Sequence, residues 1–422
     1  MKRKLFSQIL TEWRSNLWIA VELLIVSVVL WFLFDNIYSK LSIFNQPLGF
    51  DYDHCYLIQY TKLTPSSPEF IPDRTDEENN QDIHNIIEML ENRPEVEAVA
   101  VSNNAYPFNP SNSGAPIHMD TLNSDPSAYI VQRPVSPSFP IVFRMRGSNG
   151  ESPEELSRLL SECYWGFLAA DNLFDHLAPD VPPVSEFKGK PFNLDGWRGD
   201  SIPLVGTYKP FRYDDFSDKN QIQSFMFTIL PENYYWAVNE MTLRVYENMD
   251  SPDFIKNLMV DASRNIKSGN YRISAVRSFK DVRHGHIKGN LWYMRQQFFV
   301  IGFLALNIFL GILGTFWFRT RRRTREIALR MTCGASASMI FRRIITEGQL
   351  ILLFVTPFAA IIDWALTHWE LNFNYHGYFV ASRFFACVGL AWASMALMIL
   401  IGVAIPAWRA MHIAPAVALK DD

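Results

Sequence analysis

The chain has 422 residues, of which 49% are hydrophobic and 14% aromatic, and its formal net charge is −4 at pH 7. That length is enough for two or three ordinary domains. The charge is unevenly distributed, because residues 39–290 contain 34 Asp and Glu against 23 Lys and Arg, and this acidic balance argues against nucleic-acid binding by that segment.

Four apolar stretches stand out from the otherwise polar chain: residues 17–34, 298–318, 350–366 and 384–405. A hydrocarbon layer about 30 Å thick requires roughly 20 residues of helix rising ~1.5 Å per residue. We interpret all four stretches as membrane-spanning. The first ends in bulky aromatic residues without a small-x-small cleavage site, so we interpret it as an anchor rather than a signal peptide.

The Lys and Arg residues of the short flanking segments predict the orientation. Residues 319–343 contain eight arginines, whereas residues 367–383 contain one. We therefore expect both termini and the arginine-rich loop in the cytoplasm. The predicted segments are a cytoplasmic N-terminus (1–16), a first span (17–38), an extracytoplasmic domain (39–290), a second span (291–318), a cytoplasmic coupling loop (319–345), a third span (346–366), an outer loop (367–383), a fourth span (384–406) and a cytoplasmic tail (407–422).

The outer segment has the amphipathic and alternating patterns of a folded α+β domain. A helix from about Asp82 to Pro94 precedes a strand at residues 96–101, and "MTLRVYE", a helix at residues 253–265 and "YRISAVRSF" repeat the pattern near its end. Between them, "FPIVFRMRG" and "SIPLVGTYKPF" predict strands, and "SPEELSRLLSECY" predicts a helix capped by Ser152. We expect one α+β subdomain interrupted by a second. The predicted fold class is an α-helical membrane protein with four transmembrane helices and this large domain inserted between the first two.

The sequence contains few signals of chemistry. It has no phosphate-binding G-x-x-x-x-G-K-[ST] loop, G-x-S-x-G elbow, H-E-x-x-H pair or CxxC pair. We expect no catalytic residue, cofactor or metal site, since His284 and His286 form an isolated H-x-H. Cys55 and Cys163 both fall in the outer domain, where a disulfide is allowed but nothing in their spacing requires one.

The arginine-rich loop has the pattern of two helices joined by a fixed corner. Arg322, Glu326 and Arg330 are spaced four residues apart, so that Glu326 can bridge both arginines along one helical face. Gly334 suits the left-handed position at a helix end, and Ser336 or Ser338 can cap a second helix. Such a corner is suited to docking a partner, but a solvated loop is equally compatible with the charge pattern.

The loop sequence "RTREIALRMTCGASASMI" resembles the cytoplasmic motif of MacB/FtsX/LolC-type ABC transporter permeases, in which a basic stretch precedes R-E-I-x-L-R and then G-A-S. The tail "PAWRAMHIAPAVALKDD" is similar to the family's ending, and "FKGKPFNLDGWRGDSIPLVGTYKPF" resembles part of its outer domain. The resemblance implies a MacB-like core domain at residues 39–290 and an FtsX-like permease domain at residues 291–422. The loop residues that match the motif are Arg325, Glu326, Ile327, Leu329, Arg330, Gly334, Ala335 and Ser336.

This resemblance implies a transport subunit of the bacterial inner membrane that is not itself an enzyme. Its ATP hydrolysis would occur in a separate cytoplasmic P-loop ATPase, docked on these loop residues together with Arg322, and it would move the outer domain for export or efflux. A second permease chain, identical or not, is expected, and Gly311 and Gly314 give the second span a possible dimer face. Further expected partners are membrane lipids, a periplasmic adaptor and an outer-membrane channel. The alternatives are an FtsX-like signalling permease that activates cell-wall hydrolases, a lipoprotein-release permease, and a membrane receptor without an ATPase.

Overall fold

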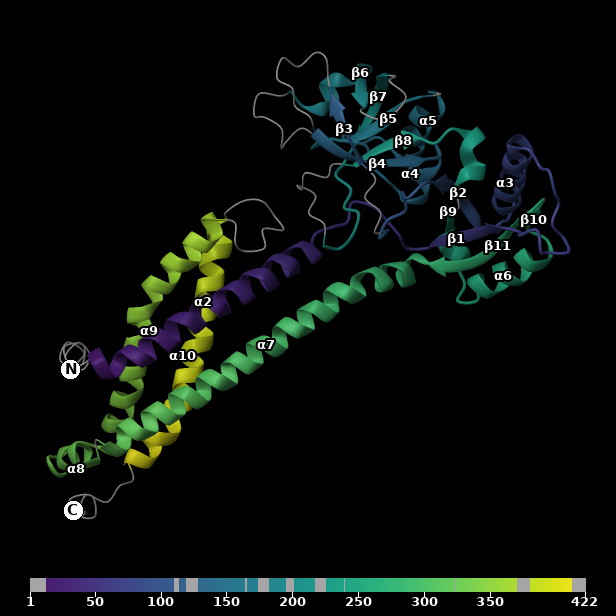
Figure 1. The fold of residues 1–422 in the computed structure, drawn as a ribbon. Helices are drawn as coiled ribbons and strands as arrows, with labels where there is room; N and C mark the ends of the chain where they lie inside the picture. Colours follow the sequence, from purple (N-terminus) through teal and green to yellow (C-terminus); the bar gives the residue numbers. More distant parts are fainter. Residues whose placement is uncertain are drawn as a thin grey trace. The chain divides into compact units, whose positions relative to one another are not determined.

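The computed structural model describes residues 13–109, 114–118, 128–163, 165–173, 182–194, 201–216, 225–238, 240–322, 324–369 and 380–411. The chain divides into two compact units, each described here by itself. Met1–Ser42 and Asn290–Asp422 form one, which we call the helical unit, and Ile43–Gly289 form the other, which we call the α/β unit. Figure 1 shows the elements of both units with the labels used below.

Long helices account for most of the helical unit. They are α2 (Trp13–Phe44), α7 (Phe279–Arg322), α8 (Thr324–Thr332), α9 (Ala337–His368) and α10 (Ala381–Met411). Among the described residues, four helical segments are long and apolar enough to cross a membrane: Leu17–Phe44, Phe279–Thr315, Ser338–His368 and Ala381–Pro406. Each of the four apolar stretches predicted from the sequence is thus part of a long helix.

The core of the helical unit follows from helical periodicity. In α10 a stripe of buried residues recurs every four positions: Cys387, Ala391, Met395, Ile399 and Val403. This spacing keeps one face of the helix turned inward. The stripe packs with residues of α2, α7 and α9, including Trp31, whose ring lies edge-on to Phe384 with 5.7 Å between the ring centroids.

Helix α7 is longer than the sequence patterns predict. It begins at Phe279, directly after the last strand of the α/β unit, whereas the predicted second span begins at residue 291. Ser278 caps its first turn, because the Ser278 hydroxyl accepts from the Asp281 N–H at 3.1 Å. The polar segment that includes His284 and His286 is therefore helical and continuous with the apolar span.

The first subdomain of the α/β unit has two β-α-β halves. Its four main strands lie in the order β11-β1-β9-β2, and all neighbours are antiparallel. This is the split β-α-β-β-α-β arrangement of ferredoxin-like folds. The elements in chain order are β1 (Cys55–Lys62), α3 (Asp76–Glu91), β2 (Val96–Ser102), β9 (Glu240–Val245), α6 (Phe254–Arg264) and β11 (Tyr271–Ser278), with β10 (Lys267–Ser268) at the edge.

Alternation along the strands separates two cores. One face of the sheet, including Ile58, Val99 and Leu243, packs under helices α3 and α6. The opposite face, including Leu57 and Ala100, packs with residues of the inserted segment. Burial on both faces explains why β9 is buried along its whole length.

The segment between β2 and β9 forms a second subdomain whose strands close into a ring. The pairings run β4-β3-β6-β7-β5-β8 and return from β8 to β4, with β4–β8 and β5–β7 parallel. A closed ring leaves no free sheet edge. The elements are β3 (Gly114–His118), β4 (Ala128–Val135), α4 (Phe139–Val142), α5 (Pro153–Ser161), β5 (Phe167–Ala170), η1 (Val184–Phe187), β6 (Pro191–Leu194), β7 (Ser201–Tyr208) and β8 (Phe225–Ile229). The connection from β8 to β9 contains η2 (Glu232–Ala237), which packs against α3 of the first subdomain, and η3 (Glu247–Met249) follows β9.

Two local predictions are corrected by the structure. The segment "FPIV", predicted as a strand, is the short helix α4, with Pro140 in its first turn and Phe139, Val142 and Phe143 buried in the core. Proline at a helix start is pre-organised for helix and removes a hydrogen bond that a strand would use. Helix α3 begins at Asp76 rather than near Asp82, because Thr75 and Glu78 form a capping box.

Candidate functional site

The corner between α8 and α9 has a defined backbone geometry. Gly334 has a φ of 93°, in the left-handed region that favours glycine. The Ala335 N–H donates to the Arg330 carbonyl at 2.9 Å, and the Gly334 N–H donates to the Met331 carbonyl at 3.0 Å. This pair of bonds is a Schellman motif, which ends α8 and satisfies its last carbonyl groups. The predicted helix end at Gly334 is confirmed.

The second side of the corner is fixed by a cap and by apolar packing. Ser336 is the N-cap of α9, and its hydroxyl accepts from the Met339 N–H at 3.3 Å. Ile327 of α8 and Ile340 of α9 are both buried in one small cluster. The two helices are therefore held together by a cap, a turn and a common apolar contact.

The charged side of α8 carries the expected ion pair. Arg330 and Glu326 form it at i, i+4 spacing. The described part of α7 reaches Arg322 and α8 begins at Thr324, and residue 323 between them lies outside the described residues, so the continuity of the helix stays a prediction. The Arg322 side chain and the predicted bridge from Glu326 to it also lie outside the described part of the chain.

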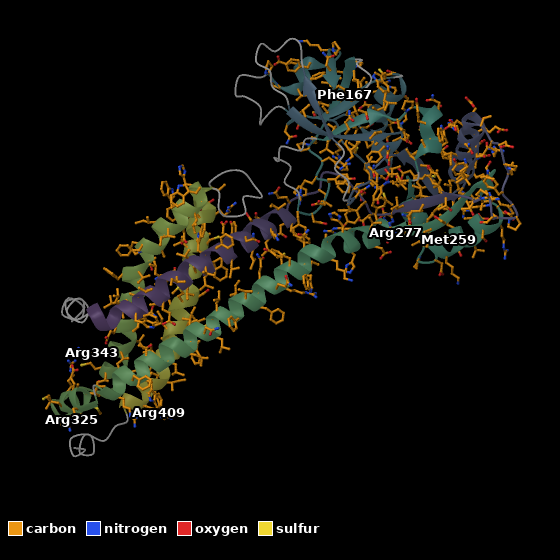
Figure 2. The ribbon with its side chains drawn as sticks, in the orientation of Figure 1. Phe167, Met259, Arg277, Arg325, Arg343 and Arg409 are labelled. Atoms are coloured by element: carbon orange, nitrogen blue, oxygen red, sulfur yellow. The ribbon has the colours of Figure 1, made fainter. Side chains whose placement is uncertain are left out.

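The remaining motif residues lie at one end of the helical unit. Arg325 is exposed, and Leu329 is 58% exposed although it is a large apolar residue. Figure 2 shows Arg325, Arg343 and Arg409 at the same end of this unit. The Arg409 guanidinium lies 4.4 Å from the ring centroid of Trp317, so the ends of α10 and α7 also meet there. We call this α8–α9 corner, with Arg409, the basic end.

The two predicted dimer-face glycines differ in their surroundings. A Cβ added to Gly311 would lie 2.3 Å from Oε1 of Glu22, so α2 of the same chain already occupies that position. A Cβ added to Gly314 would meet nothing within 4 Å. Gly311 therefore permits close approach of α2 and α7 within one chain, and Gly314 leaves open space.

Polar contacts inside the helical unit were missed by the sequence analysis. Nε and Nη2 of Arg383 in α10 donate to the Asp35 carboxylate of α2 at 2.8 and 2.9 Å. Gln297 of α7 donates to Oδ1 of Asn36 at 2.9 Å. Buried polar groups of this kind require partners, so the presence of Asp35 and Arg383 in apolar helices is the signal that could have suggested the pair.

The isolated H-x-H has a structural role at the start of α7. His286 Nε2 lies 3.3 Å from Oδ2 of Asp214, and Arg283 pairs with the buried carboxylate of Asp215. Asp214 and Asp215 follow β7 of the inserted subdomain. Within the residues that the structure describes, no group of three or more His, Cys, Asp or Glu side chains could hold a metal ion.

All four cysteines are free thiols, so the open question of a bridge between Cys55 and Cys163 is resolved against it. Cys55 is buried, and its sulfur lies 3.2 Å from the Val142 carbonyl oxygen. Burial raises the pKa of the Cys55 thiol to about 12, which keeps it protonated and unreactive at neutral pH.

Several predicted segments lie outside the described residues. These are residues 1–12 of the N-terminus, residues 370–379 of the outer loop and the tail from residue 412, which includes the end of the matched tail motif.

The chain was compared with family models, curated proteins and solved structures. No family model matches the chain, and no curated protein matches it. Among solved structures, the crystal structure of the periplasmic region of MacB from Actinobacillus actinomycetemcomitans is similar over 58% of this chain and 97% of that chain, with 8% sequence identity and a TM-score of 0.34. A structural similarity with this TM-score and identity carries no argument about function.

Proposed function

We propose that the chain is the permease subunit of an ABC transporter in a bacterial inner membrane. A separate cytoplasmic ATPase docks on the basic end, and its opening and closing are transmitted to the α/β unit on the outer side of the membrane. Both termini and the α8–α9 corner lie in the cytoplasm. The work done outside is export or efflux by mechanical transmission, without passage of substrate between the helices.

The observation that carries this proposal is the rigid corner at Gly334. A loop that serves only as a topological stop needs positive charge and no fixed shape. Here a Schellman motif, the Ser336 cap and the contact between Ile327 and Ile340 hold two helices together. Leu329 stays exposed on the first of them, which leaves apolar surface beside the arginines that a partner can cover.

The continuity of α7 supports transmission. The helix begins directly after β11 of the α/β unit, and its described part reaches Arg322, close to the start of α8 at Thr324. Its first turns are bonded to Asp214 and Asp215 of the inserted subdomain. A displacement of α8 would therefore be passed along one continuous helix to a point that is attached to both subdomains.

The exposure of α7 supports a second permease chain as partner. In the most apolar stretch of α7, 6% of the residues are buried, whereas 28–33% are buried in the corresponding stretches of the other three candidate spans. Phe299, Phe303 and Leu306 are all more than half exposed. These positions recur at helical spacing and form one apolar stripe, which a second copy of α7 or lipid would cover.

The other functions named by the resemblance share this architecture. Signalling to cell-wall hydrolases and lipoprotein release would use the same ATPase docking and differ only in what the α/β unit contacts. An ATPase-independent receptor would not need the rigid corner, so the corner favours the permease over the receptor.

The test is retention of an ATPase by corner variants of the full chain. Tagged chains are purified from host membranes in mild detergent, co-purifying P-loop ATPases are identified by mass spectrometry, and ATP turnover is measured. Gly334→Val forces a β-branched residue into a left-handed position at a cost of roughly 1 kcal/mol or more. It should abolish retention, as should Glu326→Lys, which places like charges next to Arg330.

Gly389→Val in α10 is the matched control. A Cβ at Gly389, as at Gly334, would meet nothing within 4 Å, but Gly389 has an ordinary helical backbone. It should keep the ATPase, and membrane abundance reports folding for every variant. If Gly334→Val and Glu326→Lys accumulate normally and retain full ATP turnover, the corner is only a stop signal and the proposal is wrong.

A further inference from the structure

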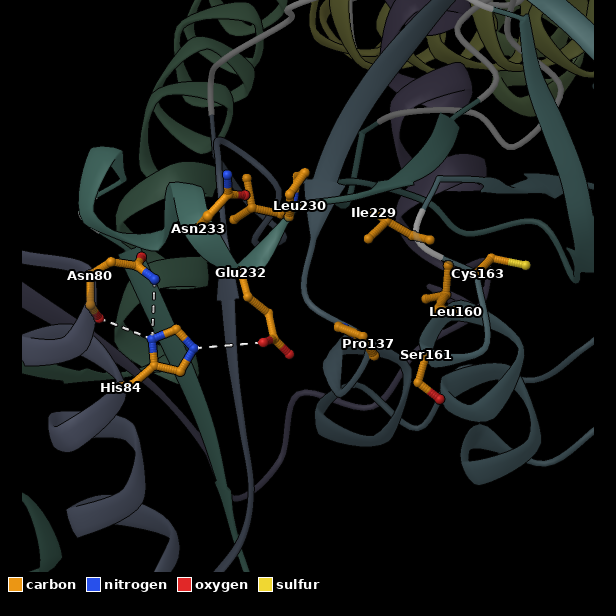
Figure 3. A pocket seen from close by; sticks show the side chains of 11 residues that line it. Asn80, His84, Pro137, Leu160, Ser161, Cys163, Ile229, Leu230, Glu232 and Asn233 are labelled. Atoms are coloured by element: carbon orange, nitrogen blue, oxygen red, sulfur yellow. Dashed lines mark hydrogen bonds and ion pairs between the residues drawn. The ribbon is translucent and has the colours of Figure 1, made fainter. Parts of the chain in front are cut away.

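The α/β unit contains a cleft of about 650 Å³ between its two subdomains. One wall comes from α3 and η2 on the side of the first subdomain, and the other from α5, the end of β8 and Pro137 of the inserted subdomain. Figure 3 shows His84 and Glu232 on one side of this cleft and Leu160 and Cys163 on the other. Its volume is in the range of small-molecule sites, which favour the boundary between two domains.

His84 is held in place by Asn80 and Tyr235. Its Nδ1 lies 2.9 Å from the Asn80 carbonyl oxygen and 3.5 Å from Nδ2 of Asn80. The shorter contact assigns the hydrogen to Nδ1, because a carbonyl oxygen can only accept. The ring also stacks on Tyr235, with 5.3 Å between centroids and 16° between planes. In the neutral imidazole, Nε2 is therefore an acceptor, and it is the nitrogen that faces Glu232.

The Glu232 carboxylate provides a second acceptor. Its Oε2 lies 3.9 Å from His84 Nε2, which is too long for a hydrogen bond between them. Two acceptors at that separation can both receive bonds of about 2.9 Å from a single donor placed between them. This wall therefore offers acceptors to a ligand that can donate.

The opposite wall is mainly apolar. Pro137, Leu160, Ser161, Cys163 and Ile229 line it. Leu160 and Ile229 are buried in the core of the inserted subdomain, so Pro137 and Cys163, which are partly exposed, supply most of its apolar surface. A ligand that reaches from the acceptors across the cleft would meet hydrocarbon there. The charge of the surrounding domain is acidic, with 34 Asp and Glu against 23 Lys and Arg in residues 39–290, which favours a cation over an anion.

We propose that this cleft binds a small amphipathic amine, whose ammonium group donates to His84 Nε2 and the Glu232 carboxylate and whose apolar body lies against Pro137 and Cys163. Because the two walls belong to different subdomains, the bound amine links them and limits their movement about the β2 and β9 connections. This site is separate from the basic end of the helical unit, and its occupation does not depend on an ATPase.

The native cysteines allow a direct test in the full wild-type chain. Cys163 lines the cleft and is partly exposed, and Cys333 is exposed in the α8–α9 corner and serves as an internal control. The chain in nanodiscs is treated with N-ethylmaleimide at pH 7.5, and modification of each cysteine is followed by peptide mass spectrometry. The probes are 4-phenylbutylamine, 4-phenylbutyrate and 4-phenylbutanol, which share one apolar body and differ in the head group.

The amine should slow modification of Cys163 at least fivefold and leave Cys333 unchanged. The carboxylate should have no effect on Cys163, and the alcohol should require about tenfold higher concentration, because a charged donor binds a carboxylate more strongly than a neutral hydroxyl does. Glu232→Gln should raise the amine concentration for half protection about tenfold. His84→Phe, which keeps the stacked ring without Nε2, should do the same.

Glu247→Gln in η3 is the control for loss of one exposed carboxylate, since Glu247 does not line the cleft. It should leave protection unchanged. Equal protection by the amine and the carboxylate, equal slowing of Cys333, or unchanged protection in Glu232→Gln would each overturn the proposal. Co-purification of the ATPase from membranes is measured for the same variants, so that loss of the amine site and loss of ATPase coupling are seen separately.

Discussion

Arg283 in the first turns of α7 holds the carboxylate of Asp215 with two nitrogens. Nη2 lies 2.6 Å from Oδ1, and Nε lies 2.9 Å from Oδ2. The Asp215 side chain is 1% exposed, and the Tyr52 hydroxyl accepts from Nη1 of the same arginine at 2.5 Å. This pair fastens the segment after β7 to the base of α7.

Asp215→Asn should destabilise the α/β unit by about 3 kcal/mol, because the Arg283 guanidinium would lose its charged partner in a partly buried place. Asp214→Asn is the matched change one residue earlier. It should cost about 1 kcal/mol or less, since His286 lies 3.3 Å away and the Asp214 side chain is 20% exposed. Thermal unfolding followed by limited proteolysis of the α/β unit would compare the two variants. Equal losses of stability would show that the ion pair of Asp215 with Arg283 stabilises the unit no more than the contact of Asp214 with His286 does.

Stability of the α/β unit should depend on pH through Glu240. Burial raises the pKa of Glu240 from 4.5 to about 7, although hydrogen bonds from the Ala105 N–H and the Ser102 hydroxyl, and the Arg133 charge, act in the opposite direction. Between about pH 4.5 and 7 the folded state then holds a proton that the unfolded state has released. Stability therefore falls as pH rises through this window, by at most on the order of 3 kcal/mol for this group.

Glu240→Gln should remove that slope and keep the oxygen that accepts from Ser102 and Ala105. Unfolding temperatures of the full chain at pH 5 and pH 8 would measure it, with Glu88→Gln on the exposed face of α3 as control. A slope that persists in Glu240→Gln would assign the pH dependence to other groups.

The two predicted dimer-face glycines of α7, Gly311 and Gly314, should respond differently to a larger side chain. Gly311→Leu should reduce the amount of folded chain in membranes, because the Glu22 carboxylate would have to move and the leucine would hold α2 and α7 further apart. Gly314→Leu should leave the folded amount unchanged and reduce the fraction of chains cross-linked as dimers. Normal dimer cross-linking in Gly314→Leu would exclude this part of α7 as the dimer face.

Native cysteines can also report the orientation of the helices. Cys163 lies in the α/β unit and Cys333 in the α8–α9 corner, and both are accessible, whereas Cys55 and Cys387 are buried. An impermeant maleimide added outside intact cells should modify Cys163 and spare Cys333, and permeabilised cells should show both modified. Modification of Cys333 in intact cells would reverse the proposed topology.

Local signals in the sequence were sufficient to predict where several helices begin or end. Ser152 caps α5 as predicted, with Glu155 completing a capping box, and Gly334 ends α8 as predicted. In each case the residues that determine the structure are within a few positions of one another. The capping box of Thr75 and Glu78 is equally local. It determines the start of α3 at Asp76, whereas the apolar periodicity begins only near Asp82, so the start predicted from periodicity was wrong.

Contacts between distant residues could not be predicted in this way. Asp35 and Arg383 are 348 positions apart, and only the packing of α2 against α10 brings them together. The parallel pairing of β4 with β8, which closes the ring, likewise leaves no local pattern. The approach of Glu22 to Gly311 depends on which faces of two helices meet, and hydrophobicity alone does not specify this.

The inserted subdomain leaves and re-enters the first at adjacent positions, because Ser102 and Glu240 are directly paired neighbours on β2 and β9. Everything between them could be replaced by a two-residue hairpin turn without moving either strand. During evolution the ring of strands can therefore be lengthened, exchanged or lost, while the sheet of the first subdomain and the helix α7 that follows it keep their connections.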